Sequence, residues 1–149
     1  MAPDAPLAFR WLESDAQLLD AFDLMRELRG ELERGGFVAA VRAIQAVNGY
    51  RMAGGFSGDR LVCLAGVHRN HGLSRGPHLR VDDLVVARDG RGRGFGREML
   101  RFLAREAKRQ GVPSLLLDAR DEAKPFYSRL GFDYRRSTPC SIPVERLLG

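Results

Sequence analysis

Residues 84–100, which read LVVARDGRGRGFGREML, constrain the fold more than any other part of the chain. An apolar strand ends near Ala87, a glycine-rich turn follows, and a helical pattern starts at about Gly94. No Ser, Thr, Asp or Asn stands where it could cap this helix, so its first backbone amides are open to an anion. Such amides carry partial positive charge, and glycines allow a close approach. The expected occupant is a diphosphate, held by Gly92, Gly94 and Gly96 with added positive charge from Arg91, Arg93 and Arg97.

Other kinds of glycine-rich turn fit the sequence less well. The Gly-Lys-Ser/Thr of a P-loop is missing, which excludes a Walker-type nucleotide site. A Rossmann dinucleotide site is disfavoured because the spacing is G-x-G-x-G and the turn follows about the fourth strand instead of the first. A flexible Gly/Arg loop without a ligand stays open as an alternative at this point.

The composition is that of an ordinary globular protein. Of 149 residues, 44% are hydrophobic and 29% charged, and no low-complexity linker divides them, so one domain over residues 1–149 is expected. No apolar run is long enough to span a membrane, and the first residues lack the pattern of a secretory leader. We therefore expect a cytoplasmic protein without a membrane partner, in which Cys63 and Cys140 are buried free thiols.

The net charge of +5 raises the question of nucleic-acid binding. Much of the positive charge falls between Arg88 and Arg109, around the glycine-rich turn, which favours a local phosphate site. No helix-turn-helix signal, aromatic RNA-binding motif or zinc-finger spacing is found, so no nucleic-acid partner is predicted. No metal site is predicted either, because no Cys or carboxylate stands among His68, His71 and His78.

Hydrophobic periodicity and turn residues divide the chain into strands and helices. The predicted strands cover residues 7–12, 50–56, 60–67, 79–87 and 114–119, and a last strand begins at Phe132. The predicted helices cover about 14–28, 37–47, 94–110 and 121–130. Ser14 and Gln17 form a capping-box pattern at the start of the first helix. This order predicts an α/β (α+β) fold in which a mixed sheet has helices on both faces.

Two motifs in the second half of the chain resemble the GNAT family of N-acetyltransferases. Residues 91–96 match the R-x-x-G-x-G signature of that family and follow an L-x-V strand pattern that begins at Leu84. Residues 123–132 are similar to the family's A-x-x-F-Y…G-F ending, with Tyr127 and Gly131 at the matching places. The motifs stand at the family's usual separation, and the resemblance covers about a third of the chain.

The resemblance implies a sheet of six to seven strands that splays open between strands 4 and 5, with about four flanking helices and acetyl-CoA in the opening. One departure is Arg120, which stands where many relatives have an asparagine that bonds the pantetheine arm. The backbone of the strand would pair with that arm, and the amides of the turn would hold the pyrophosphate. The implied cosubstrate site consists of Leu84, Val85, Val86, Arg91, Gly92, Arg93, Gly94, Phe95, Gly96 and Arg97.

Acetyl transfer to an amine needs a neutral nucleophile and a proton for the departing CoA thiolate. Tyr127, the tyrosine of the family's F-Y pair, is predicted to be the general acid, with simple packing beside Phe126 as the alternative. Asp82 and Asp83 match an acidic segment that approaches the acceptor nitrogen in sugar-phosphate and polyamine acetyltransferases. Adjacent strand residues point to opposite faces, so only one carboxylate is expected to face the cleft. Solvated charges near a strand end are the alternative for both.

These residues predict an acetyl-CoA-dependent N-acetyltransferase that acts on a primary amine of a small molecule or peptide by direct attack. The alternative is a non-catalytic acyl-CoA-binding or regulatory domain, which the departure at Arg120 keeps open. A homodimer is a further expectation, because the last strand and residues 139–148 could pair with a second subunit, as often happens in this family.

Overall fold

The computed structural model describes residues 6–149, and residues 1–5 lie outside the described part. The chain forms two compact units, the first extending to Asp118 and the second covering residues 119–149. That residues 1–149 make a single domain stays a prediction.

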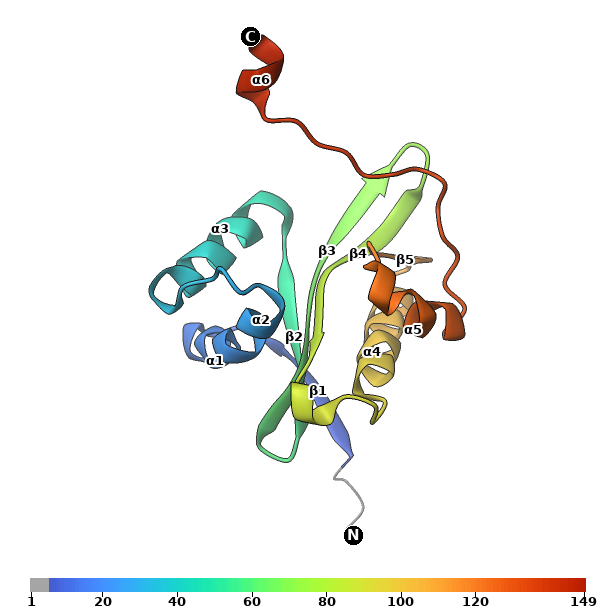
Figure 1. The fold of residues 1–149 in the computed structure, drawn as a ribbon. Coiled ribbons are helices and arrows are strands. Elements are labelled where there is room, and N and C mark those ends of the chain that lie inside the picture. The colour runs from blue at the N-terminus through green and yellow to red at the C-terminus, as the bar shows by residue number, and fades with distance from the viewer. Residues whose placement is uncertain (1–5) are drawn as a thin grey trace. The chain divides into compact units, whose positions relative to one another are not determined.

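The first unit is built on one mixed sheet in the order β1-β2-β3-β4-β5 (Figure 1). Strands β1 to β4 are antiparallel neighbours, and β5 joins the edge of β4 in parallel. The strands are β1 (Leu7–Leu12), β2 (Arg51–Ser57), β3 (Arg60–Gly72), β4 (Gly76–Val86) and β5 (Leu115–Leu116).

The sheet has five strands in the described residues, so the predicted count of six to seven is wrong. The segment after Phe132 forms no strand in the part that the structure describes. It contains Pro139 and Pro143, which cannot donate to a ladder, and its side chains from residue 133 onward are exposed. The hairpin of β3 and β4 is longer than predicted, because Gly76, with φ of 66°, allows a tight turn.

Helices cover both faces of the sheet, as predicted (Figure 1). Ser14 and Gln17 form the predicted capping box, but the first predicted helix is divided at Ala21 into two. One face of the sheet carries α1 (Asp15–Asp20), α2 (Phe22–Leu28) and α3 (Phe37–Asn48), and the other carries α4 (Phe95–Arg109).

The apolar core of the first unit lies between the sheet and α1–α3. Leu18 of α1, Met52 of β2 and Leu64 of β3 are fully buried there. The rings of Phe22 and Phe37 meet edge-on at 5.3 Å and join α2 to α3. This packing fixes which face of β3 and β4 lies beneath these helices.

Helix α4 packs its predicted apolar face on the other side of the sheet. Phe95, Met99, Leu103 and Ala107 recur one turn apart and are all buried. Near the start of the helix, the Sγ atom of Cys63 lies 3.9 Å from the carbonyl oxygen of Phe95. The first turn of α4 is therefore seated directly on β3.

The two thiols have different surroundings. Cys63 is buried, and this burial raises the pKa of its thiol to about 12. Cys140 is exposed, so the prediction of a buried thiol is confirmed for Cys63 and wrong for Cys140. The difference arises because Cys140 lies in the exposed segment that forms no strand.

The second unit contains α5 (Lys124–Arg129) and α6 (Val144–Leu148). A 3-10 turn over Asp121–Ala123 leads into α5, where a longer helix over 121–130 was expected. The ring of Tyr127 packs edge-on against Phe126 and Phe132, at centroid distances of 5.1 and 5.2 Å. With α6 and the divided first helix, the described residues contain six α-helices instead of about four.

The sheet splays open between β4 and β5, as predicted. β5 pairs with β4 only at Leu79 and Arg80. Beyond Arg80, β4 continues to Val86 with β3 on one side and, within the described residues, no strand on the other. This edge has backbone groups without ladder partners, which an extended molecule can use for hydrogen bonds.

Candidate active site

The turn between β4 and α4 leaves its backbone open. Gly92 and Gly94 have φ of 79° and 84°, in the left-handed region that favours glycine. Gly94 is the N-cap of α4, and the helix start has no side-chain cap. A Cβ built at either glycine meets no atom within 4 Å, so the space over the turn is open. The uncapped helix start expected from the sequence is therefore present.

The predicted arginines belong to the same turn and to the first turn of α4. Arg91 and Arg97 are exposed, and the guanidinium of Arg93 lies 5.1 Å from the centroid of the Phe95 ring. That ring packs on Gly90, where a Cβ would lie 2.9 Å from it. The buried phenyl ring thus anchors the turn, while the arginines add positive charge near the helix N-terminus.

The predicted strand residues Leu84, Val85 and Val86 lie on the open edge of β4, directly before this turn. Val85 is buried in the core, which fixes the strand from the side of α1–α3. The open edge and the uncapped amides follow one another along the chain. Their order fits an extended arm that ends in a diphosphate.

Asp83 accepts hydrogen bonds from two distant parts of the chain. The guanidinium of Arg29, just after α2, donates to its Oδ1 from Nη2 at 2.9 Å and from Nε at 3.1 Å. The Tyr50 hydroxyl donates to its Oδ2 at 2.8 Å. Burial raises the pKa of Tyr50 well above its usual range, and the charge of Asp83 adds to this, so the phenol stays protonated.

A close contact with β3 makes room for this network. The Tyr50 hydroxyl lies 1.8 Å from where a Cβ of Gly66 would stand, and its Cζ lies 2.4 Å from the same point. Only glycine fits at position 66 with the ring in this place. The hydrogen bond between Tyr50 and Asp83 therefore depends on a missing side chain in the neighbouring strand.

Asp82 has different partners. Its Oδ2 lies 2.5 Å from Nδ1 of His68, and its Oδ1 lies 3.8 Å from Nε of Arg80. Arg80 is bound more closely to Asp118, with 2.5 Å between Nη2 and Oδ2. His68 is thus the nearest charged or polar partner of the Asp82 carboxylate.

A β-bulge in β4 separates the two carboxylates. Gly66 of β3 pairs with Asp83, but the next residue, Val67, pairs with Val81. Asp82 is therefore an extra residue in β4 with no partner of its own across the ladder.

The bulge changes the expected directions of the side chains. Opposite faces were predicted for Asp82 and Asp83 on the assumption of regular alternation, which does not hold here. Gly66 lies opposite Asp83, and His68 stands two residues after Gly66 in β3. The side chain of His68 therefore points to the face on which Asp83 meets its partners. The contact with His68 brings the Asp82 carboxylate to that face as well.

Tyr127 belongs to the second unit and is buried. Burial raises the pKa of its phenol, and the nearby Tyr134 adds to the shift. The phenol therefore keeps its proton at neutral pH. Its ring contacts in this unit are with Phe126 and Phe132.

The sequence matches the acetyltransferase (GNAT) family over residues 10–132. The chain belongs to this family. It is 25% identical over 125 residues to the uncharacterized N-acetyltransferase YhdJ of Bacillus subtilis, covering 81% of the chain and 88% of that protein. Over 52 residues it is 38% identical to the probable glucosamine 6-phosphate N-acetyltransferase 2 of Oryza sativa, a match to 35% of the chain and 31% of that protein.

The fold is similar to that of aminoglycoside N-acetyltransferase AAC(6')-Iy, solved in complex with CoA. The TM-score is 0.79 at 15% identity, and the match covers 96% of the chain and 98% of that structure. The family match over residues 10–132 makes the protein a GNAT acyltransferase, with acetyl-CoA as its cosubstrate. The open edge of β4 and the uncapped turn are features of this chain that fit such a molecule.

The candidate site also contains residues outside the predicted set. They are His68, Arg29, Tyr50 and Gly66, which meet the two predicted aspartates from separate elements. In the sequence, His68 was considered only among three histidines for which no metal site was predicted. Nothing near Arg29 in the sequence points to a partner 54 positions away.

The three histidines of the GNAT chain do not come together. His68 pairs with Asp82, His71 is exposed, and His78 is buried with Nδ1 at 3.0 Å from the Gly76 carbonyl oxygen. Across residues 6–149, no group of three or more His, Cys, Asp or Glu side chains is placed to hold a metal ion.

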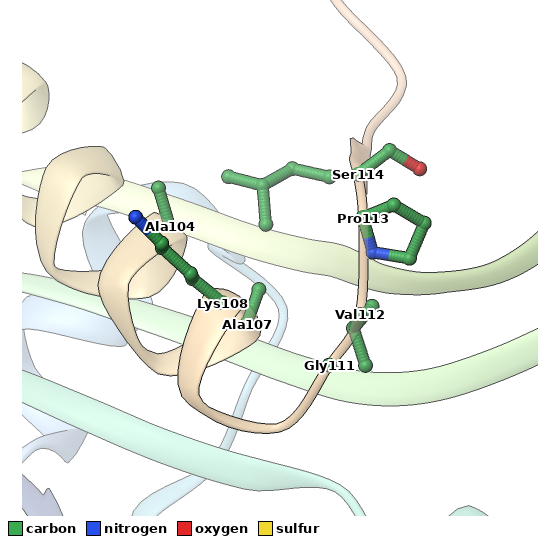
Figure 2. Close-up of a pocket in the computed structure, with 8 residues that line it drawn as sticks. Ala104, Ala107, Lys108, Gly111, Val112, Pro113 and Ser114 are labelled. Carbon is green, nitrogen blue, oxygen red and sulfur yellow. The ribbon is translucent and has the colours of Figure 1, made fainter.

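A pocket of about 400 Å³ lies at the far end of α4 from the glycine-rich turn (Figure 2). Lys108 is the one charged residue among those that line it, and no predicted site residue takes part. The pocket is therefore separate from the features that fit acetyl-CoA. Its lining consists of Ala104, Ala107, Lys108, Gly111, Val112, Pro113, Ser114 and Leu115.

In the described part of the acetyltransferase, no helix is long and apolar enough to cross a membrane.

Proposed function

We propose that this acetyltransferase transfers the acetyl group of acetyl-CoA to a primary amine of a small molecule or peptide by direct attack. The observation that carries the proposal is the open edge of β4 running into an uncapped helix N-terminus. The backbone of Leu84, Val85 and Val86 would pair with the pantetheine arm. The amides of the turn from Gly92 to Arg97 would hold the pyrophosphate, with charge from its arginines.

The open edge of β4 comes before the glycine-rich turn in the chain, and this order determines which way the cosubstrate would lie along β4. The diphosphate end belongs at the turn after Val86, so the arm would run back along β4 toward Asp82. The acetyl group would then lie near the point where β5 leaves β4, close to the two aspartates. The acceptor amine would approach from the same place.

The two aspartates differ in what they can offer an amine. The Asp83 carboxylate already accepts three hydrogen bonds, from Arg29 and Tyr50, and its side chain is 15% exposed. The Asp82 side chain is 31% exposed and has one close partner. Asp82 is therefore proposed to contact the acceptor, and Asp83 to hold the surrounding groups in place.

The class of acceptor is an amine of unspecified size. The names of the rice relative and of the CoA-bound structure give glucosamine 6-phosphate and aminoglycosides as acceptors of those proteins. Both are amino sugars, which supports a test that includes such compounds. It does not select one acceptor for this chain.

Tyr127 is proposed to give its proton to the CoA thiolate as the C–S bond breaks. The support is its place in the A-x-x-F-Y motif together with a raised pKa, which keeps the phenol protonated. Arg120, in place of the family's asparagine, would then leave one pantetheine contact unmade.

A dimer and a cytoplasmic location complete the proposal. Ile142, Val144, Leu147 and Leu148 are between 50% and 76% exposed, an apolar set that a second subunit could cover. The two free thiols are typical of a reducing compartment. Light scattering of the purified protein, with Leu147→Glu as the variant, tests the dimer.

The test of the function is release of the CoA thiol when the purified protein meets acetyl-CoA and a panel of amines. The panel contains glucosamine 6-phosphate, an aminoglycoside, spermidine and a peptide with a free N-terminus. Release that depends on one of these amines supports the proposal. Tight acetyl-CoA binding without release on any amine would support a binding or regulatory domain instead.

Replacement of Tyr127 by phenylalanine tests its role. We expect kcat to fall about 100-fold, because general acid catalysis contributes at least that much, while the affinity for acetyl-CoA changes little. Tyr134→Phe, which alters the exposed neighbouring tyrosine, is the control. Unchanged turnover in Tyr127→Phe removes this residue from the mechanism.

A further inference from the structure

We infer that His68 takes the proton from the acceptor amine and that Asp82 is its positioning residue. The inference rests on the proposed function, because it concerns the amine side of the same reaction. It replaces the direct contact between Asp82 and the acceptor with an action of Asp82 through His68.

The contact between the two side chains sets the tautomer of the imidazole. An ionised carboxylate only accepts hydrogen bonds, so Nδ1 of His68 must donate to Oδ2 of Asp82 across their 2.5 Å separation. In the neutral ring the lone pair then stands on Nε2, the nitrogen turned away from Asp82. A carboxylate that orients a histidine in this way prepares the other nitrogen to accept a proton.

The position of the pair fits the end of the cosubstrate that reacts. Asp82 lies two residues past Arg80, the last residue of β4 that pairs with β5. The open edge thus begins beside the pair and ends at the diphosphate turn. His68 is 16% exposed at its side chain, which is enough for contact with a small amine and little enough to limit solvent.

The other charged groups on this face are already engaged. Arg29 and Tyr50 donate to Asp83, and Arg80 is bound by Asp118. Asp83 already accepts three hydrogen bonds, so fewer of its lone pairs are open to an amine. The imidazole contacts Asp82, and the charged and polar groups linked to Asp82 and its neighbour are Asp83 and Arg80 of β4, Arg29 after α2, Tyr50 before β2, and Asp118 after β5.

The reaction balances with these residues. Nε2 of His68 takes one proton from the ammonium group and later passes it to solvent. The neutral amine then forms the N–C bond while the C–S bond breaks, and the thiolate takes the proton of Tyr127. The second proton lost by the nitrogen restores the Tyr127 phenol, so the products are the amide, CoA and one proton.

The experiment measures kcat by thiol release, with the panel amine that the unmodified protein acetylates fastest, and the affinity for CoA by calorimetry. His68→Gln is expected to lower kcat about 100-fold and to leave CoA affinity within about twofold. His71→Gln, on the exposed part of the same strand, is the matched control and should keep full activity. Added imidazole should restore part of the activity of His68→Ala, which a merely structural role would not allow.

Asp82→Asn tests the positioning role. It is expected to lower kcat about 10- to 100-fold, the usual range for a residue that orients a reacting group. The double variant His68→Gln with Asp82→Asn should be no slower than His68→Gln alone, because Asp82 acts only through the imidazole. Effects that multiply would overturn this coupling.

The outcomes separate this inference from the proposed function. If Tyr127→Phe is slow but His68→Gln keeps full turnover, the His68 role is wrong and acetyl transfer to an amine stands. If His68→Ala binds CoA but gains nothing from imidazole, the role of His68 as proton acceptor is wrong as well. If the unmodified protein acetylates no amine of the panel, both ideas fail together.

Discussion

The two sides of the candidate site are built in different ways. On the cosubstrate side, one continuous stretch from Leu84 to Arg97 supplies an open strand edge, two left-handed glycines and an uncapped helix start. On the acceptor side, Asp82 and Asp83 meet side chains from β3, from the end of α2 and from the residue before β2. The first side is made of backbone and the second of side chains that converge.

This difference determines how each side can be damaged. A backbone site depends on φ angles and open amides, so it should respond to changes at its own glycines and to little else. A converging network depends on close packing, so one added methyl group in a neighbouring strand can disturb all of it. Glycine substitutions on the two sides can separate these two kinds of sensitivity.

The largest effect is expected for Gly66→Ala. The new Cβ would stand 1.8 Å from the Tyr50 hydroxyl, so the ring must move and its hydrogen bond to Asp83 is lost. We expect the free energy of unfolding to fall by about 3 kcal/mol, from overpacking and an unpaired buried acceptor together. Urea denaturation measures it, and Gly72→Ala, where a Cβ in the same strand meets nothing within 4 Å, is the control. Equal losses in both variants would contradict the network.

A smaller effect is expected for Gly92→Val on the cosubstrate side. A left-handed backbone costs a branched residue about 1–2 kcal/mol, so the turn should shift and the affinity for acetyl-CoA should fall about tenfold. Calorimetric titration with acetyl-CoA measures this change. Gly58→Val introduces similar strain in the turn between β2 and β3, at φ of 60°, and should leave the affinity unchanged. A similar loss of affinity in both would show that strain alone, wherever it lies, accounts for the result.

The acceptor side should also give the protein an alkaline limit. Burial and Asp83 raise the pKa of Tyr50 above its ordinary 10.0, so the unfolded chain releases this proton first as pH rises. Its contribution is constant below pH 10 and is lost above it, at about 1.4 kcal/mol per pH unit. Tyr50→Phe should make the stability fall less steeply above pH 10.

The smallest effect concerns the two thiols. A thiol with a pKa of about 12 has almost no thiolate at pH 8, so Cys63 should react slowly with Ellman's reagent and Cys140 rapidly. Because Cys63 lies under the first turn of α4, it reports on the packing of the cosubstrate side. Gly66→Ala should leave it protected if the two sides are independent. Rapid reaction of both thiols in that variant would show that they are coupled.

The cosubstrate side could be predicted from the sequence because the residues that form it are neighbours in the chain. The strand, the glycine spacing and the absent cap are neighbours in the chain, and the structure confirms the splayed sheet, the uncapped helix and the buried face of α4. The capping box of Ser14 and Gln17 is confirmed for the same reason.

The acceptor side could be predicted from the sequence only in part. Asp82 and Asp83 were recognised from a family resemblance, but their partners lie 14 to 54 positions away in the chain. The β-bulge at Asp82 could not be predicted from the sequence, because it depends on the register between β3 and β4 and not on the residues of one strand. The last strand, expected to begin at Phe132, is wrong, because the segment that follows is exposed and contains two prolines that cannot donate to a ladder.

The bulge at Asp82 has a consequence for how this site can change. An extra residue bends the strand that carries it, and β4 loses its pairing with β5 two residues before that point. The same single residue thus supplies a carboxylate and helps to part the two strands. Deletion of Asp82 would remove an acidic group and would also allow β4 and β5 to pair further along the chain. One mutation would therefore change both the acceptor side and the opening for the cosubstrate.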